Sequence, residues 1–216
     1  MLNGSDRVRT AVLVSGGGTN LQAILNARGG VIRHAEISLV VSNKPKAYAL
    51  ERAKNAGIPA EAISQKALGG REAFEQELQR LLELHQIELI VLAGFLTILS
   101  PEFTRRWDHR ILNIHPALIP SFCGKEYYGL HVHEAALARG VKVTGATVHF
   151  VNEIPDGGEI LLQKAVEVLP GDTPEILQRR VMEQAEWILL PQAVETVAAD
   201  LLKAADPSKT IDKESK

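Results

Sequence analysis

Apolar segments of strand length alternate with amphipathic helical segments along the first 140 residues, and this alternation limits the possible folds more than any other feature. Strand-like runs are expected at 9–15, 35–44, 58–63, 87–95 and 111–115. Apolar residues at helical spacing are expected to form helices between and after them, at 20–27, 47–57, 70–86 and 129–140. This order predicts a parallel sheet with helices on both faces.

The last third of the chain follows a different pattern. "VTGATVHFV" and "GEILLQKAVEVL" alternate with period two around a polar connection, which predicts an antiparallel hairpin. A helix is then expected from a cap at Asp172 or Thr173 with Pro174 in its first turn, and Pro191 is expected to kink or divide it. The predicted fold is therefore α/β, an open, mostly parallel Rossmann-like sheet with flanking helices and a C-terminal antiparallel hairpin.

Composition narrows the function classes. The 216 residues carry a formal net charge of -2, which does not favour non-specific binding to nucleic acid or to an anionic membrane. The single cysteine, Cys123, excludes an internal disulfide and a cysteine-based metal site. Neither a membrane-spanning apolar run nor a signal peptide is readable, so a cytoplasmic enzyme is expected. Residues 206–216 are polar and are expected to be disordered.

A glycine-rich segment joins the first strand to the first helix. Gly17, Gly18, Thr19 and Asn20 offer backbone N–H groups at a helix N-terminus, where a phosphate binds well. Leu21 stands where a dinucleotide fingerprint needs its third glycine, so a phosphate monoester fits better than a dinucleotide. The alternative interpretation is a tight turn without a ligand.

Asn113 and His115 lie two residues apart at the end of a predicted strand, so their side chains share one face. An amide beside an imidazole can stabilise an oxyanion while the imidazole moves a proton. The alternative is a buried polar pair. Asp156 follows a proline in a polar loop, where an aspartate that forms a turn is the more common case. His149 is either a partner of Asp156 or a histidine of the core.

Two further histidines, His131 and His133, follow in the helix at 129–140. Their i, i+2 spacing directs them to different faces, which makes a poor metal pair. No other metal-ligand motif is readable, so we expect no metal.

Eight segments together resemble one family. "VLVSGGGTNLQAIL", "VSNK", "LAGFLTILSPEF", "NIHPALIPSF", "GLHVHEAAL", "GATVHFV", "IPDGG" and "GDTP" occur in the order found in phosphoribosylglycinamide formyltransferases. The resemblance covers about residues 8–195. It implies transfer of a formyl group from 10-formyltetrahydrofolate, as co-substrate, to the amine of glycinamide ribonucleotide in purine synthesis. It also implies a single domain over 1–205, with a nucleotide-phosphate half at about 8–115 and a folate and catalytic half at about 116–205.

The resemblance assigns roles residue by residue. Asn113 and protonated His115 match oxyanion-stabilising residues, and Asp156 is expected to keep His115 charged and to help move the proton. Thr147 and His149 are expected to support this trio from behind. The expected substrate and folate contacts are Arg71, Leu92, Phe95, Leu96, Thr97, Ile98, Leu99, Ile154 and Glu186. Only small-molecule partners are implied, with no nucleic acid or membrane, and the chain is expected to be a monomer or homodimer.

Departures from the family pattern concern substrate contacts. Thr97 replaces an arginine, and the loop at 121–129 is about five residues longer than usual. Ala185 stands where the family carries a glutamate. Glu186 can replace that glutamate only if the helix is rotated or irregular there, and Glu183 is a second candidate.

Three rival activities stay open at this point. A methionyl-tRNA formyltransferase would usually carry a further nucleic-acid-binding domain and a basic surface, and would lack this glycine loop. A formyltetrahydrofolate hydrolase would usually carry an N-terminal regulatory domain, and here almost nothing precedes residue 8. A nicotinamide dehydrogenase is disfavoured by the incomplete dinucleotide fingerprint. A binding module without catalysis would not need Asn113, His115 and Asp156 together.

Overall fold

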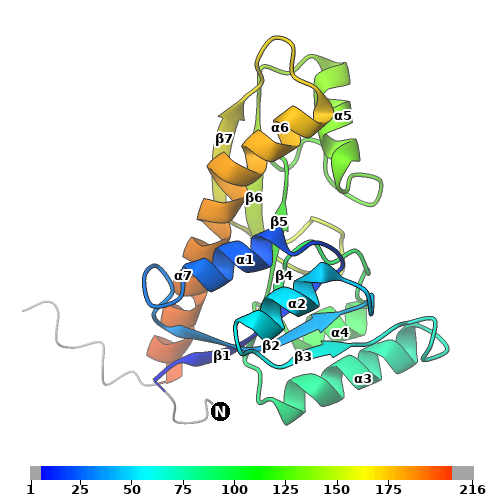
Figure 1. Ribbon diagram of the computed structural model, residues 1–216, viewed down its shortest axis with the longest axis vertical. Coiled ribbons are helices and arrows are strands. Elements are labelled where there is room, and N and C mark those ends of the chain that lie inside the picture. The colour runs from blue at the N-terminus through cyan, green and yellow to red at the C-terminus, as the bar shows by residue number, and fades with distance from the viewer. Residues whose placement is uncertain (1–5, 206–216) are drawn as a thin grey trace, which may run out of the picture.

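Seven strands form one sheet in residues 6–205, the part of the chain that the computed structural model describes (Figure 1). They are β1 (Val8–Val14), β2 (Ala35–Ser42), β3 (Ala60–Ala62), β4 (Leu89–Leu92), β5 (Ile111–His115), β6 (Val143–Phe150) and β7 (Ile160–Glu167). The spatial order is β3-β2-β1-β4-β5-β6-β7. The first five strands are parallel, and β6 runs antiparallel to both β5 and β7. The predicted fold class is confirmed, and the tail predicted at 206–216 lies outside the described residues.

Helices connect most of the strands. They are α1 (Thr19–Asn26), α2 (Tyr48–Asn55), α3 (Arg71–Leu84), α4 (Pro101–Arg106), α5 (Leu130–Arg139), α6 (Pro174–Val181), a π-helical turn (Met182–Glu186) and α7 (Trp187–Ala205). Of these, α4 was not predicted, because six residues are too few to show helical periodicity. Its start was nevertheless encoded: Ser100 accepts a hydrogen bond from the Phe103 N–H, and Pro101 occupies the first helical position.

Both faces of the sheet are buried at β1, β2, β4 and β5, which explains why these strands read as continuous apolar runs. Along β1, Val12 and Val14 belong to a core shared with α1, α2, α6 and α7. The alternate residues Ala11 and Leu13 belong to a second core shared with α3 and α4. Figure 1 shows α1 and α7 side by side on the first face, with the β6–β7 hairpin extending beyond the parallel part of the sheet.

The strand order reverses between β1 and β4, since β1 leads to β2 on one side while β4 leads to β5 on the other. Ligands of open α/β sheets bind at such a reversal, beyond the carboxyl ends of the strands. At that end, the Leu96 N–H donates to Ser15 Oγ at 2.9 Å, and Asn43 Nδ2 donates to Thr97 Oγ1 at 2.8 Å. The segments that follow β1, β2 and β4 are therefore held together around one crevice.

The C-terminal helix starts as predicted but is interrupted elsewhere than expected. Thr173 caps α6 and Pro174 follows it. The interruption is the π-helical turn at Met182–Glu186, and Pro191 lies inside the continuous helix α7. The expectation that Pro191 divides the helix is therefore wrong. The N–H that Pro191 lacks would bond to the carbonyl of Trp187, at the junction where the hydrogen-bond pattern already changes.

Gly145 in β6 is expected to be essential for packing the hairpin. A Cβ at this position would lie 2.1 Å from the Lys164 carbonyl oxygen of β7 and 2.8 Å from Leu118 Cδ2. Gly145→Ala should lower the free energy of unfolding by about 1–3 kcal/mol, because backbone must move to admit the methyl group. Gly30→Ala is the control, since its Cβ would meet nothing nearer than 3.7 Å. Equal unfolding midpoints in urea for the two variants would contradict this account.

Candidate active site

Two adjoining cavities open at the carboxyl ends of β1, β4 and β5. The main cavity measures about 520 Å³ and the smaller one about 120 Å³. Phe95, Ile98, Asn113, Pro155 and Asp156 line both. The predicted catalytic residues Asn113 and Asp156 therefore stand at the junction of the cavities, and His115 lines the main one.

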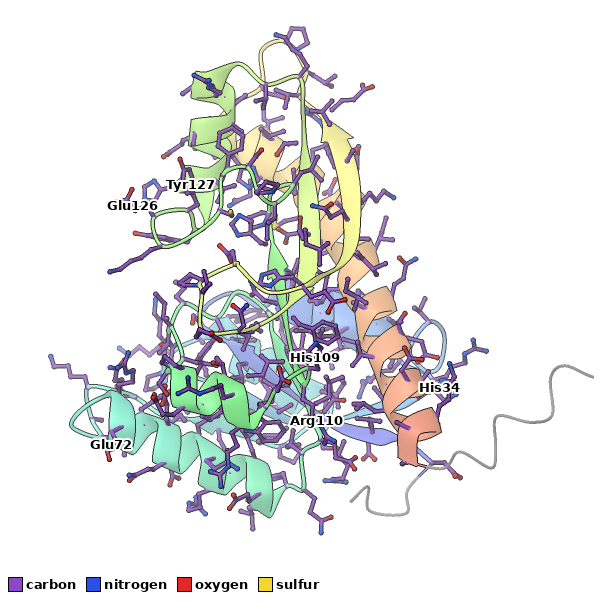
Figure 2. All side chains as sticks on the ribbon, turned by 180° about the vertical axis from the view of Figure 1, so that it is seen from behind. His34, Glu72, His109, Arg110, Glu126 and Tyr127 are labelled. Atoms are coloured by element: carbon purple, nitrogen blue, oxygen red, sulfur yellow. The ribbon has the colours of Figure 1, made fainter. Side chains whose placement is uncertain are left out.

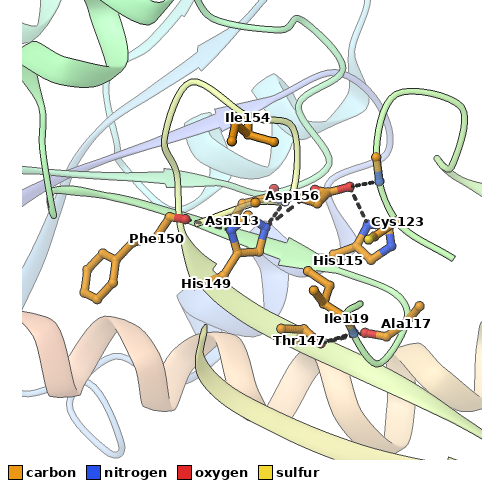
Figure 3. Close-up of polar contacts among 12 residues, drawn as sticks. Asn113, His115, Ala117, Ile119, Cys123, Thr147, His149, Phe150, Ile154 and Asp156 are labelled. Atoms are coloured by element: carbon orange, nitrogen blue, oxygen red, sulfur yellow. Dashed lines mark hydrogen bonds and ion pairs between the residues drawn. The ribbon is translucent and has the colours of Figure 1, made fainter. Parts of the chain in front are cut away.

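The catalytic candidates come from two segments that β6 brings together. Asn113 and His115 lie on β5, where they pair with His149 and Thr147 of the antiparallel strand β6. Asp156 lies in the β6–β7 connection, with a left-handed backbone at φ 56°. Figure 3 shows the Asp156 carboxylate between the imidazoles of His115 and His149.

The Asp156 carboxylate is held from several sides. Its Oδ2 accepts a hydrogen bond from the Gly124 N–H at 2.8 Å and lies 3.5 Å from His115 Nδ1. Its Oδ1 lies 3.5 Å from His149 Nε2 and 3.4 Å from Asn113 Nδ2. Burial opposes ionisation, but the contacts with His149, His115 and the Gly124 amide outweigh it and lower the pKa of Asp156. The aspartate is therefore ionised at neutral pH.

His115 is neutral in the free site. Its Nε2 lies 2.7 Å from the Phe122 carbonyl oxygen, so Nε2 carries a proton and Nδ1 is the basic nitrogen. Burial lowers the pKa of His115 and outweighs the Asp156 carboxylate and the Phe122 carbonyl, which both raise it. As expected, the Asp156 carboxylate raises the pKa of His115, but in the free site burial lowers that pKa by more. The expected role of Asp156 in keeping His115 charged during the reaction stays a prediction.

His149 fixes the amide of Asn113. The His149 Nδ1 lies 2.7 Å from the Phe150 carbonyl oxygen and donates to it. Its Nε2 lies 3.1 Å from Asn113 Nδ2 and 3.5 Å from Asp156 Oδ1, so the ring holds the Asn113 amide against Asp156. The second N–H of Asn113 makes only the long contact to Asp156 and is available for a ligand.

Thr147 supports the segment that follows β5. Its Oγ1 donates to the Ala117 carbonyl at 2.7 Å and accepts from the Ile119 N–H at 3.1 Å (Figure 3). Thr147 is fully buried, so these bonds tie β6 to the turn after His115. His149 and Thr147 therefore both lie behind the trio, in the places where they were expected.

The glycine-rich segment leaves the start of α1 open. Gly18 caps the helix with a left-handed backbone at φ 73° and provides no side chain, so the N–H groups of the first turn are not capped. A Cβ on Gly18 would lie 2.6 Å from Ala49 Cβ. Thr19 and Asn20 line the main cavity, whereas Gly17 is bound through its carbonyl by Arg52 Nε at 2.8 Å.

The π-helical turn places Glu186 inside the main cavity wall. Its carboxylate accepts a hydrogen bond from Asn20 Nδ2 at 2.8 Å, and burial raises the pKa of Glu186 to about 7. Glu183 instead lies at the surface, where it accepts from Arg179 Nε at 2.8 Å. The helix is thus locally irregular as replacement by Glu186 requires, because a π-helical turn holds one residue more than an α-helical turn.

The expected folate contacts divide between the two cavities. The smaller cavity is lined by Leu92, Phe95, Thr97, Ile98, Leu99 and Ile154, and the main cavity by Phe95, Leu96 and Ile98. Arg71 is exposed at the start of α3 and does not line either cavity. The structure therefore does not bring Arg71 together with the other candidates.

Several residues at the site were missed from the sequence. Gln178 of α6, Met182 of the π-helical turn and His133 of α5 line the main cavity, and the Phe122 carbonyl contacts His115. The helical register of His133 with the buried residues Val132 and Ala136 was the one available signal.

The long loop before α5 borders the main cavity, as its position after the catalytic strand predicts. Gly124, Lys125, Tyr127, Tyr128 and Gly129 are among the lining residues. Figure 2 shows Glu126 and Tyr127 on this loop, which projects from the half of the molecule that carries β6 and β7.

Residues 6–205 lack both a metal-binding cluster and a membrane-spanning helix. These residues contain no group of three or more His, Cys, Asp or Glu side chains placed to hold a metal ion. Within the same range, none of the helices combines the length and apolar character that crossing a membrane requires.

Known proteins are similar to this chain in both sequence and fold. Residues 8–194 match the family model described as formyl transferase. The chain is 39% identical over 201 residues to the phosphoribosylglycinamide formyltransferase of Escherichia coli K12, covering 93% of this chain and 92% of that protein. It is 45% identical over 205 residues to the trifunctional purine biosynthetic protein adenosine-3 of Gallus gallus, covering 95% of this chain but only 20% of that relative's length. The crystal structure of glycinamide ribonucleotide transformylase 1 from Symbiobacterium toebii matches with a TM-score of 0.84 and 40% identity, over 93% of this chain and 92% of that one.

The buried carboxyl group of Glu186 should make stability depend on pH. Because its pKa is raised to about 7 in the folded state, the folded protein binds the proton more tightly and loses stability as pH rises from 4.5 to 7. Glu186→Gln should therefore gain about 3 kcal/mol relative to wild type between pH 4.5 and pH 8. Urea unfolding at both pH values measures this change. Glu183→Gln is the exposed control and should show no such trend; an equal trend in both variants would contradict the assignment.

Proposed function

Because this chain belongs to the formyl transferase family, we propose that it transfers a formyl group from 10-formyltetrahydrofolate to the amine of glycinamide ribonucleotide, a step of purine biosynthesis. The observation that carries the proposal is the meeting of Asn113, His115 and Asp156 where the two cavities join. A direct assay with both substrates and the purified chain tests it.

The chain's residues can stabilise the charge that develops during the reaction. The amine nitrogen attacks the formyl carbon, a C–N bond forms, and the carbonyl electron pair moves to oxygen. The free N–H of Asn113 is the donor for this oxyanion, and His149 holds the amide in place at 3.1 Å. The long contact between Asn113 and Asp156, 3.4 Å in the free site, is given up at little cost.

Neutral His115 is the proton carrier in this proposal. Its Nδ1 accepts the proton released by the attacking nitrogen, and the ionised Asp156 carboxylate, 3.5 Å away, stabilises the imidazolium that results. The same proton is returned to N10 of the folate when the C–N10 bond breaks. The products are the formylated amine and tetrahydrofolate, so atoms and charge balance.

The smaller cavity suits the ring system of the formyl donor. Leu92, Phe95, Ile98 and Leu99 supply apolar walls, and residues 152–156 complete the lining. When bound there, the donor supplies the formyl group at the junction where Asn113 stands. This fit supports the folate as co-substrate and does not require a metal ion.

The main cavity suits the mononucleotide. The open first turn of α1, with Gly18, Thr19 and Asn20, is a site for a phosphate monoester. Glu186 lies beside Asn20 and can contact the sugar or the amine. Because residues of both halves line this cavity, we also propose that 1–205 acts as a single domain.

The remaining partners follow from this assignment and are proposals with it. We infer a cytoplasmic enzyme with small-molecule substrates and no nucleic-acid partner, active as a monomer or homodimer. Another 10-formyltetrahydrofolate-dependent transferase or a hydrolase is the alternative activity, and release of formate without an acceptor amine in the assay would favour the hydrolase.

Substitutions in the trio should act on one step. Asn113→Ala or His115→Ala should each lower kcat by about 10²–10³-fold, because each removes a group that stabilises the transition state. Asp156→Asn should also lower kcat severely while keeping the fold. The double variant that combines Asn113→Ala with His115→Ala should lose less kcat than the product of the two single losses, because the two residues act as a unit.

His109→Ala is the matched control for these variants. His109 is exposed just before β5, where it contacts Asp108 and Glu159 (Figure 2). The kcat of His109→Ala should equal that of wild type. Near-normal kcat in any folded trio variant would rule out the proposed mechanism.

The long loop is expected to cover bound substrate. Tyr127 packs edge-on against Phe122, and Tyr128 is 52% exposed at the cavity mouth, where an aromatic ring can close over a ligand. Deletion of 125–128 between Gly124 and Gly129 should raise KM for at least one substrate. Steady-state kinetics with each substrate varied measures this, with thermal unfolding as the folding control. Unchanged KM values in a stable deletion variant would show that the loop only packs against its neighbours.

A further inference from the structure

His133 is a buried polar residue in the main cavity that the proposed mechanism does not use. It lies on α5, its side chain is 1% exposed, and it lines the cavity together with His115 and Glu186. Both ring nitrogens, Nδ1 and Nε2, are buried without a hydrogen-bond partner within residues 6–205. Buried polar groups are almost always paired, so two unpaired nitrogens on one ring require an explanation.

The charge state of the ring limits what it can bind. Burial, together with a smaller contribution from the neighbouring His115, lowers the pKa of His133 to about 4. His133 is therefore neutral at physiological pH, with one nitrogen donating and the other accepting. Such a ring does not attract a phosphate as a cation does, whereas it complements a hydroxyl group, which both donates and accepts.

A second unpaired group lies in the same cavity. Asn20 Oδ1 is buried without a partner, while its Nδ2 donates to Glu186 at 2.8 Å. Asn20, Glu186 and His133 thus give the wall between the start of α1 and the catalytic strand a set of incompletely satisfied hydrogen-bonding groups. A ligand with its phosphate at α1 and its amine at His115 must place its sugar along this wall.

We propose that His133 hydrogen-bonds a ribose hydroxyl of the phosphorylated substrate and so selects for a ribonucleotide. This inference rests on the proposed function, because it assumes glycinamide ribonucleotide as the occupant of the main cavity. His133 touches the substrate away from the reacting atoms, so its removal acts on KM for the nucleotide and leaves KM for the folate unchanged.

The test combines substitutions of His133 with deletions of substrate hydroxyls. His133→Leu removes both nitrogens, and His133→Gln keeps a donor and an acceptor. His133→Leu should raise KM for glycinamide ribonucleotide about tenfold, the effect of one hydrogen bond, and His133→Gln should recover part of the loss. His109→Leu is the control, because His109 is exposed, contacts Asp108 and Glu159 as ion-pair partners, and lines neither cavity.

The 2′-deoxy and 3′-deoxy forms of the substrate identify the contact. In wild type, one of them should bind about tenfold more weakly than the ribonucleotide, and in His133→Leu that penalty should disappear. Equal penalties in the two proteins, or an unchanged KM in folded His133→Leu, would overturn the inference and leave His133 as a core or water-bound histidine.

A binding measurement separates this inference from the proposed function. Addition of glycinamide ribonucleotide without any folate should shift the ¹⁵N resonance of one His133 ring nitrogen, and an unchanged spectrum of a saturated protein would also overturn the inference. If wild type formylates the substrate and folded His133→Leu has an unchanged KM for glycinamide ribonucleotide, the inference is overturned and the proposed function stands. Wild type that neither binds nor formylates the substrate overturns the proposed function, and the inference with it.

Discussion

The antiparallel pairing of β5 with β6 is the constraint on which the site depends. It sets Asn113 opposite His149 and His115 opposite Thr147, so each catalytic candidate has a fixed partner behind it. Because β6 is antiparallel, it ends at Phe150 opposite Leu112, near the start of β5. The β6–β7 connection then folds back along β5 and places Asp156 beside Asn113 and His115.

The electrostatics of the site follow from burial as much as from neighbouring charges. Asp156 stays ionised because N–H groups and imidazoles surround it, whereas His115 and His133 lose their protons in the free site because their rings are desolvated. Glu186 holds a proton up to about pH 7 for the same reason. At neutral pH the cavity therefore holds the ionised carboxylate of Asp156 and the neutral ring of His133, while Glu186 is close to the midpoint of its titration.

One irregular turn links the C-terminal helix to this site. The π-helical segment at Met182–Glu186 rotates the helix so that Glu186 points inward to Asn20 while Glu183 stays with Arg179 at the surface. Regular α-helical geometry would set the inward direction by the 3.6-residue period alone. The extra residue of the turn is thus what allows a glutamate one position later to reach the cavity wall.

The order and type of most elements were determined by the sequence itself. Alternation of apolar strands with helices specified the sheet, and the spacing of Asn113 and His115 placed them on one face of β5, because both depend on local periodicity. The position of the glycine-rich turn before α1 and the cap at Thr173 were equally local. The short helix α4 and the position of the helix interruption were not predicted, because neither produces a periodic pattern of apolar residues in the sequence.

Only the tertiary structure decided which distant residues meet and in what charge state. Asp156 reads as a turn former until the β6–β7 connection folds back and the Gly124 N–H binds its carboxylate. The sequence alone does not show that His133 is buried. Only the packing of α5 beside the cavity encloses both ring nitrogens without a hydrogen-bond partner among the described residues. Arg71, which the family pattern placed near the nucleotide, stays at the surface of α3. Burial and long-range contact are properties of the packed chain, and no local pattern of residues encodes them.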